Sequence, residues 1–181
     1  PEILKMQTRA ITEAAIECAK RKVRAVPELM IPLVSLRSEL AKLRGLCEEA
    51  IRETRQAQDF AGRVEIKIGT MIEIPRAAIT ADEIAEVADF FSFGTNDLTQ
   101  LVFGFSRDDV GSFLPAYLTQ ELIPVDPFQS LDCTGVGRLV EMGVELGRQT
   151  NENIKLGICG EHGGDPASVH FCHRVGLDYV S

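Results

Sequence analysis

Apolar residues recur along the chain with two spacings, and segments of one kind alternate with segments of the other. Apolar positions three to four residues apart predict amphipathic helices, whereas short continuous apolar runs predict strands buried on both faces. The predicted helices are 4–22, 37–58, 76–87 with a restart at Thr80, 96–103, 136–149 and 166–175. The predicted strands are 28–34, 64–74, 89–94 and 154–159, while 177–180 opens a fifth and 105–127 is predicted to be irregular.

The alternation of helices and strands indicates the fold class. It predicts an α/β protein with a parallel sheet whose faces are covered by helices. Four clear strands and a fragment are too few for a closed (β/α)8 barrel, which takes about 250 residues. An open sheet and one part of a barrel both fit the pattern. Because the sequence begins at Pro1 and stops just after the apolar 177–180, we expect residues 1–181 to be part of one domain, cut at both ends.

Composition narrows the classes of partner. The net charge of −8 argues against binding to nucleic acid or to a membrane surface, because both need basic stripes. No apolar run reaches the length of about 18 residues that predicts a membrane span. The five cysteines are odd in number and form no C-x-x-C pair, which is typical of free thiols in a reducing compartment.

Candidate chemistry gathers where three of the predicted strands end. Glu73 closes the second strand, Gly94-Thr95-Asn96-Asp97 follows the third, and Cys159 closes the fourth. In parallel α/β architectures ligands bind at the carboxyl ends of the strands, so these residues are expected on one face. Two carboxylates can hold one Mg²⁺ and leave its other positions to water and substrate oxygens. Equally, Glu73 can face outward, and Asn96 or Asp97 can simply cap the next helix.

The segment Gly157–Gly164 places Cys159 among four glycines, which allow tight turns and close approach to a ligand. One interpretation is a small buried core residue. A second is a thiol that donates a proton, since an ordinary cysteine pKa of about 8.5 keeps it protonated near neutral pH. A third, weaker one is a nucleophile activated by His162.

Other polar residues give less specific signals. Arg76 suits either a phosphate or an acidic partner, and Arg107 belongs either to a loop that closes over the site or to a solvated turn. His170 and His173 flank Cys172 on a predicted helix, but their spacing matches no four-ligand zinc site.

Three motifs together resemble a known family. They are IGTMIEIPRAA at 68–78, FSFGTNDLTQ at 91–100 and GICGEHGGDP at 157–166. In this combination they are similar to the C-terminal domain of the pyruvate, phosphate dikinases, and the likeness extends over nearly the whole chain. The second and third motifs recur, slightly altered, in phosphoenolpyruvate synthase and in enzyme I of the sugar phosphotransferase system. Phe93 and the FGFSRDD loop at 103–109 favour the dikinases.

The resemblance implies a fold and a set of roles. It implies the C-terminal part of a (β/α)8 TIM barrel of the phosphoenolpyruvate-binding type, with Mg²⁺ as cofactor. The residues that match the metal ligands are Glu73 and Asp97. The matched substrate-binding residues are Glu73, Gly94, Thr95, Asn96 and Asp97. Cys159 matches the cysteine that adds or removes the proton on the substrate methyl or methylene carbon.

The resemblance also implies a reaction and partners. ATP, phosphate and pyruvate would be converted reversibly into AMP, diphosphate and phosphoenolpyruvate, with a nucleotide-binding domain and a phosphohistidine domain elsewhere in a homodimeric parent enzyme. Such an enzyme is expected in the cytoplasm, a plastid or another organelle. The family's early barrel strands, with their phosphate-gripping arginines, and its phosphohistidine motif do not occur in this sequence, so we expect no dikinase activity from the chain by itself. Two other classes remain: a Mg²⁺-dependent aldolase or lyase, and a non-catalytic binding module.

Overall fold

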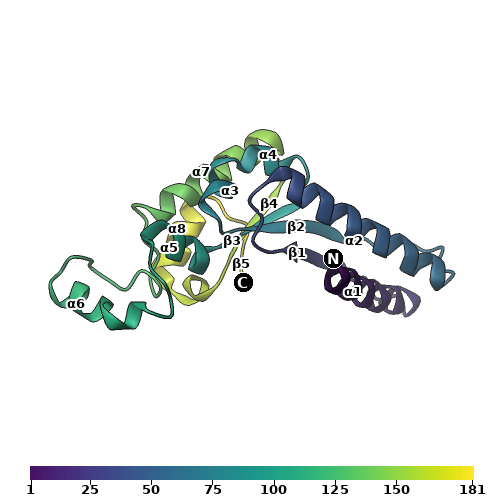
Figure 1. Cartoon of the computed structure of the whole chain (residues 1–181). Helices are drawn as coiled ribbons and strands as arrows, with labels where there is room; N and C mark the ends of the chain where they lie inside the picture. Colours follow the sequence, from purple (N-terminus) through teal and green to yellow (C-terminus); the bar gives the residue numbers. More distant parts are fainter.

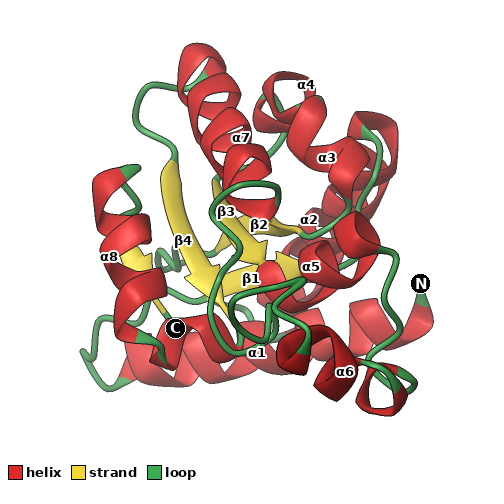
Figure 2. Ribbon diagram, turned by 90° about the vertical axis from the view of Figure 1, so that its left-hand side faces the viewer, coloured by secondary structure: helices red, strands yellow, loops and turns green.

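A five-stranded parallel sheet forms the centre of the computed structural model, which describes all residues from 1 to 181 (Figures 1 and 2). Each strand pairs with the next strand of the sequence, in the order β1-β2-β3-β4-β5. The strands are β1 (Glu28–Ile31), β2 (Lys67–Ile72), β3 (Phe90–Gly94), β4 (Lys155–Cys159) and β5 (Tyr179–Val180). The predicted strands and the parallel sheet are therefore confirmed.

Helices connect the strands and cover the sheet. The α-helices are α1 (Glu2–Lys20), α2 (Arg37–Ala57), α3 (Pro75–Ile79), α4 (Ala81–Ala85), α5 (Thr95–Phe103), α6 (Leu114–Thr119), α7 (Val136–Thr150) and α8 (Pro166–Arg174). Two short 3-10 helices are η1 (Val110–Ser112) and η2 (Glu161–Gly164). The predicted restart at Thr80 is confirmed, since this residue separates α3 from α4. No helix combines the length and the apolar character that crossing a membrane requires.

The segment between α5 and α7, residues 104–135, departs from the sequence prediction. We call it the excursion; it contains η1 and α6 and extends away from the sheet in Figure 1. Its irregular assignment was wrong for 114–119, where Pro115 stands in the first turn of α6. Phe105, Phe113 and Tyr117 hold this short helix, with ring centroids 5.0 to 6.1 Å apart. A helix of six residues is too short to leave a periodic pattern in the sequence.

The outer face of the sheet carries the hydrophobic core. Alternate residues of each strand point to the helices, among them Ile68, Ile72, Phe91, Phe93, Leu156 and Ile158, all of them buried. Glycines let α7 approach these rings closely. A Cβ added to Gly143 would lie 2.8 Å from the Phe93 ring, and one added to Gly147 would lie 2.9 Å from the Phe91 ring. The close contact of α7 with β3 therefore depends on both glycines.

An ion pair across the inner face shows that the sheet is curved. Lys155 at the start of β4 contacts both carboxylate oxygens of Glu28 at the start of β1, each at 2.9 Å. Two strands lie between them, and in a flat sheet their backbones would be about 14 Å apart. The pair therefore lies on the concave side of the sheet. Curvature and consecutive strand order together make this sheet a part of a barrel wall rather than a flat open sheet.

At the amino end of β3, Asp89 ties two neighbouring strands together. Its Oδ2 accepts a hydrogen bond from the Ile68 amide of β2 at 2.8 Å. Arg44 of α2 donates to its other carboxylate oxygen at 3.0 Å and to the carbonyl oxygen of Val87 at 3.2 Å. A helix, a loop and two strands are thus joined at one point.

The same arrangement recurs at the amino end of β5. Asp178 accepts from the Leu156 amide of β4 at 2.8 Å. Arg148 of α7 lies 3.7 Å from the Asp178 carboxylate and donates to the Gly176 carbonyl oxygen at 2.5 Å. The amino ends of the strands are therefore held by paired charges at two equivalent positions.

Candidate functional site

The consecutive strand order brings the candidate residues together at the carboxyl ends of β2, β3 and β4. Glu73 follows β2, Asn96 and Asp97 lie in the first turn of α5, and Cys159 is the last residue of β4. Gly94 and Cys159 are direct partners in the register of β3 with β4. The thiol and the acidic residues consequently lie around one point of the sheet edge.

Glu73 is a buried carboxylate with 1% exposure, so the alternative of an outward-facing side chain was wrong. Its Oε1 accepts a hydrogen bond from the Leu33 amide at 2.7 Å. Leu33 has a φ of 56°, an unusual conformation for a leucine, and its amide makes this contact in that conformation. Burial raises the pKa of Glu73, the nearby Asp97 carboxylate raises it further, and the Leu33 amide opposes both effects. No cationic side chain lies within ion-pair distance of Glu73 to offset the charge.

Gly94 makes room for this carboxylate. A Cβ added to Gly94 would lie 2.6 Å from Glu73 Oε2 and 2.8 Å from the methyl carbon of Met71. Both distances are far shorter than a van der Waals contact, and any side chain here would displace the acid. The glycine of the GTND segment therefore has a steric role beside Glu73.

Asp97 places its carboxylate next to Glu73, and the neighbouring Asn96 lies against the turn that follows Cys159. The N-cap residue of α5 is Gly94, so neither side chain is the N-cap of this helix, and that alternative was wrong. Asn96 Oδ1 is buried and has no hydrogen-bond partner. A Cβ added to Gly160 would lie 3.0 Å from the Asn96 amide, so the turn after Cys159 packs closely against Asn96. A buried acceptor without a partner indicates that a donor or cation belongs there.

This donor set fits Mg²⁺. The carboxylates of Glu73 and Asp97 lie side by side, and oxygen is the ligand atom that Mg²⁺ prefers. No group of three or more acidic, histidine or cysteine side chains forms a closed metal cage anywhere in the chain. Two carboxylates with several positions left for water and substrate is the usual arrangement for Mg²⁺, so Glu73 and Asp97 match it.

Cys159 lies half-buried on the inner face of β4, outside the hydrophobic core. Its Sγ is 3.7 Å from the Phe93 carbonyl oxygen, to which the thiol donates. Burial raises the pKa of Cys159, and the charges of Glu73 and Asp97 raise it as well, against a lowering by the Ser92 hydroxyl. The group is therefore a protonated thiol at neutral pH and can serve as a proton donor, not as a ready nucleophile.

His162 does not contact Cys159. Its ring is fully buried, with Nδ1 2.6 Å from Thr95 Oγ1 and Nε2 2.9 Å from the Pro127 carbonyl oxygen. Both nitrogens are occupied by these partners. The interpretation of a nucleophilic cysteine activated by His162 was therefore wrong.

The remaining candidates lie around this centre. Arg76 donates to the Ser35 carbonyl oxygen at 2.6 Å and binds no acidic side chain. Arg107 of the excursion pairs with Glu161 at 3.0 Å and lines an open hollow of about 630 Å³ beside the turn after Cys159. His170 and His173 are exposed on α8. None of these four side chains reaches the carboxylates.

Sequence reasoning missed two groups at the site. The Leu33 amide left no signal, because its role depends on a backbone angle. Ser92 did leave one, since in the FFSF strand it alternates onto the same face as Gly94. Its hydroxyl is buried next to the Cys159 thiol.

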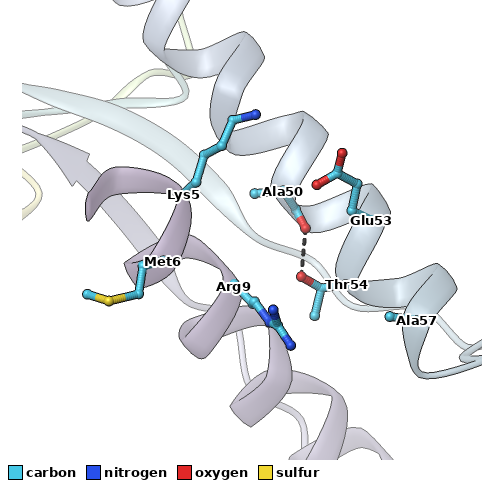
Figure 3. Close-up of a pocket in the computed structure, with 7 residues that line it drawn as sticks. All are labelled: Lys5, Met6, Arg9, Ala50, Glu53, Thr54 and Ala57. Atoms are coloured by element: carbon cyan, nitrogen blue, oxygen red, sulfur yellow. Dashed lines mark hydrogen bonds between the residues drawn. The ribbon is translucent and has the colours of Figure 1, made fainter. Parts of the chain in front are cut away.

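A separate groove of about 360 Å³ lies between α1 and α2, and none of the candidate site residues lines it (Figure 3). In Figure 3 Lys5, Met6 and Arg9 come from α1, with Met6 turned away from α2, and Glu53 and Thr54 come from α2. The Thr54 hydroxyl donates to the carbonyl oxygen of Ala50 in its own helix, at 2.7 Å. Only scattered surface charges line this groove, and no catalytic arrangement converges on it.

Comparison with known proteins gives two findings. The family model described as "PEP-utilising enzyme, PEP-binding domain" matches residues 1–181. Pyruvate, phosphate dikinases are similar over the whole chain: the one from Clostridium symbiosum is 58% identical, that from Rhizobium meliloti 55%, and the chloroplastic one from Flaveria pringlei 52%. The matched region makes up 21%, 20% and 19% of these relatives, so the chain spans about a fifth of their length.

Proposed function

The chain belongs to the PEP-utilising enzymes through their PEP-binding domain, and on that premise we propose that it is the pyruvate- and phosphoenolpyruvate-binding part of a pyruvate, phosphate dikinase. The similarity to dikinases at 52% to 58% identity over the whole chain supports this choice within the family. Residues 1–181 would then be the C-terminal part of a phosphoenolpyruvate-binding barrel. One observation carries the proposal: two carboxylates face each other without any cation, directly beside a protonated thiol.

The carboxylates are proposed to hold the cofactor. Burying Glu73 next to Asp97 costs free energy unless a positive charge offsets the repulsion. Mg²⁺ bound by Glu73 and Asp97 would supply that charge and would stabilise negative charge on substrate oxygens. The Asn96 side chain, whose oxygen is buried and unpaired, precedes Asp97 in the first turn of α5.

Cys159 is proposed to move the proton. In the direction of pyruvate, the thiol gives its proton to the methylene carbon of the enolate, which becomes a methyl group. In the direction of phosphoenolpyruvate, the thiolate takes a proton from the methyl carbon. The raised pKa of Cys159 favours the protonated form and therefore suits the acid role.

Asn96 and Thr95 are proposed to orient the substrate by different atoms. The amide of Asn96 can reach a substrate oxygen. The Thr95 hydroxyl lies 2.6 Å from a His162 nitrogen and is fully buried. We therefore assign to Thr95 only its backbone amide, in the first turn of α5, as a donor to the substrate.

The whole reaction needs groups that we place outside this chain. ATP, phosphate and pyruvate would react to AMP, diphosphate and phosphoenolpyruvate, with a nucleotide-binding domain and a phosphohistidine domain as partners in a homodimer. We expect no dikinase activity from residues 1–181 alone. We propose the cytoplasm as the compartment, or a plastid in a plant, since both bacterial and chloroplastic relatives are similar to the chain.

Binding of oxalate, a stable analogue of the pyruvate enolate, tests the proposal by titration calorimetry. We expect the chain to bind oxalate in Mg²⁺ and to lose that binding in EDTA. Glu73→Gln and Asp97→Asn should each weaken it more than about tenfold, the cost of one charge-assisted contact. Asp108→Asn, a change of an exposed acid in the excursion, is the matched control. Binding that is equally tight without Mg²⁺, or unaffected by both variants, would contradict the proposal.

A second experiment tests Cys159 in a full-length dikinase that contains this chain. Exchange of solvent deuterium into the methyl group of pyruvate should disappear in Cys159→Ala, while Mg²⁺-dependent oxalate binding stays within about threefold, because the thiol does not bind the metal. Unchanged exchange would exclude the role assigned to the thiol.

A further inference from the structure

His162 is a buried polar side chain for which the proposed chemistry has no direct use. It belongs to η2, three residues after Cys159. Its two partners come from other segments: Thr95 opens α5 beside the acidic residues, and Pro127 is buried in the returning part of the excursion. One imidazole ring therefore joins three segments that surround the site.

The hydrogen-bond partners define the form of the ring. A carbonyl oxygen can only accept, so Nε2 must carry the hydrogen that it donates to Pro127. No carboxylate lies within ion-pair distance of the ring, and both partners are satisfied when the ring carries one hydrogen, on Nε2. Nδ1 then lacks a hydrogen and accepts one from the Thr95 hydroxyl. The other neutral tautomer would leave the Pro127 carbonyl oxygen without a donor.

The contact of His162 with Thr95 joins the turn after Cys159 to the start of the helix that carries Asp97. Gly94 is paired with Cys159 across the sheet, and the next residue, Thr95, is held by His162. Gly160 packs against Asn96 between these two points. The position of Thr95 determines where the following Asn96 and Asp97 begin the first turn of α5.

We propose that His162 is a positioning residue of the phosphoenolpyruvate site: through Thr95 it fixes the metal-binding strand end relative to Cys159, and through Pro127 it ties both to the excursion. The ring touches neither the proposed metal position nor the reacting carbon. A shift of the Thr95 end would change the distance between thiol and substrate without altering either group. This inference rests on the proposed function for its chemical meaning, but the geometry it concerns can be measured without any ligand.

Two substitutions separate the two hydrogen bonds. Asparagine is short, so in His162→Asn its amide oxygen lies near the place of Nδ1 and can still accept from Thr95, while the Pro127 bond is lost. Glutamine is longer, so in His162→Gln its NH₂ group lies near the place of Nε2 and can still donate to Pro127, while the Thr95 bond is lost. His170→Asn and His170→Gln are matched controls on the exposed side of α8.

Nuclear magnetic resonance of the 181-residue chain can measure the effect of each substitution at Thr95 and near Pro127. In His162→Gln we expect the Thr95 side chain to sample several rotamers, seen in its three-bond couplings, with little change in the excursion. In His162→Asn we expect a single Thr95 rotamer. There the amides of Gln129 and Ser130, which donate to Asp126 next to Pro127, should exchange about tenfold faster, the effect of one lost hydrogen bond.

The outcomes decide between positioning and space filling. Equal effects of both variants at Thr95 and in the excursion, or no effect at either place, would overturn the proposal. If the variants fail to fold, the wild-type chain still gives an answer through the nitrogen shifts of its His162. A ring with the hydrogen on Nδ1, or one that exchanges between tautomers, would overturn it as well.

Oxalate binding in Mg²⁺ adds the functional readout. His162→Gln should weaken binding about tenfold and His162→Asn by less than about threefold, because only the first releases Thr95. The reverse order would contradict the proposal. A wild-type chain that binds no oxalate would count against the proposed function, whereas the rotamer and exchange data would still decide the role of His162.

Discussion

The acidic residues at the amino ends of the strands differ in their partners from Glu73 and Asp97 at the carboxyl ends. At the amino ends of the strands, Glu28, Asp89 and Asp178 are each paired with a lysine or an arginine. At the carboxyl ends, Glu73 and Asp97 face each other without a cation. Carboxylates therefore join elements at one end and keep space for a ligand at the other. The comparison teaches that pairing, more than burial, distinguishes the structural acids from the functional ones.

The largest effect is expected at the amino end, from Asp89→Ala. This change leaves Arg44 and the Ile68 amide without their partner, so the free energy of unfolding should fall by about 2 to 3 kcal/mol. Urea denaturation measures it. Asp108→Ala, at an exposed acid, should stay within about 0.5 kcal/mol. Equal losses of unfolding free energy in the two variants would show that Asp89 has no special structural role.

The opposite sign is expected at the carboxyl end, from Glu73→Gln. Glutamine can still accept from the Leu33 amide but removes the repulsion with Asp97, so stability in EDTA should rise by about 1 kcal/mol. Added Mg²⁺ should stabilise the wild type and not the variant. Glu152→Gln, an exposed change on the loop before β4, is the control. A destabilised Glu73→Gln protein would break the comparison between the two ends.

A smaller effect is expected from the ion pair across the curved sheet. Lys155→Met keeps most of the length of the side chain and removes its charge. Because both partners are partly exposed, unfolding free energy should fall by about 0.5 kcal/mol, and the difference should shrink in high salt. Thermal melts at low and high salt measure it. A loss above about 2 kcal/mol would mean that the pair determines the curvature instead of accompanying it.

The smallest effect is expected from Asp165, an acidic residue near the carboxyl ends of the strands whose carboxylate already has hydrogen-bond partners. Asp165 caps α8 and accepts hydrogen bonds from Ser168 and Ser130, which lower its pKa to about 2 from an ordinary 3.8. The folded state binds this proton less readily than the unfolded state. Its contribution is therefore present above pH 3.8 and is lost as the pH falls towards 2.

Asp165→Asn should remove that part of the acid dependence in urea denaturation between pH 2 and pH 5. An unchanged pH profile would contradict the assignment of Asp165 as a structural acid. If the profile changes as expected, pairing distinguishes the two kinds of acid even at the same end of the sheet.

The strands and the parallel sheet could be predicted from the sequence, because continuous apolar runs such as 154–159 are typical of buried parallel strands. The meeting of Glu73, Asp97 and Cys159 followed from the rule that parallel strands end on one side. The apolar pattern alone did not decide between an open sheet and a part of a barrel, because the curvature appears in a contact between residues 28 and 155. Helix α6 was missed because six residues show no period.

At the site, residue types were predictable and their partners were not. The raised pKa of Cys159 depends first on burial and then on the charges of Glu73 and Asp97, which follow two other strands. The role of His162 depends on Thr95 and Pro127, which lie 67 and 35 residues away in the sequence. Such distant pairs leave no local pattern in one sequence.

The consecutive pairing of strands has a consequence for how the chain folds. Each strand can dock on the one before it, so β1, β2 and β3 need no contact with later segments to begin assembling. The contact of Glu28 with Lys155 is different, because 127 residues separate its partners. We expect it to form after the folding barrier, so that Lys155→Met speeds unfolding and leaves the folding rate almost unchanged. The ion pair across the sheet would then slow the unfolding of a structure that has already assembled strand by strand.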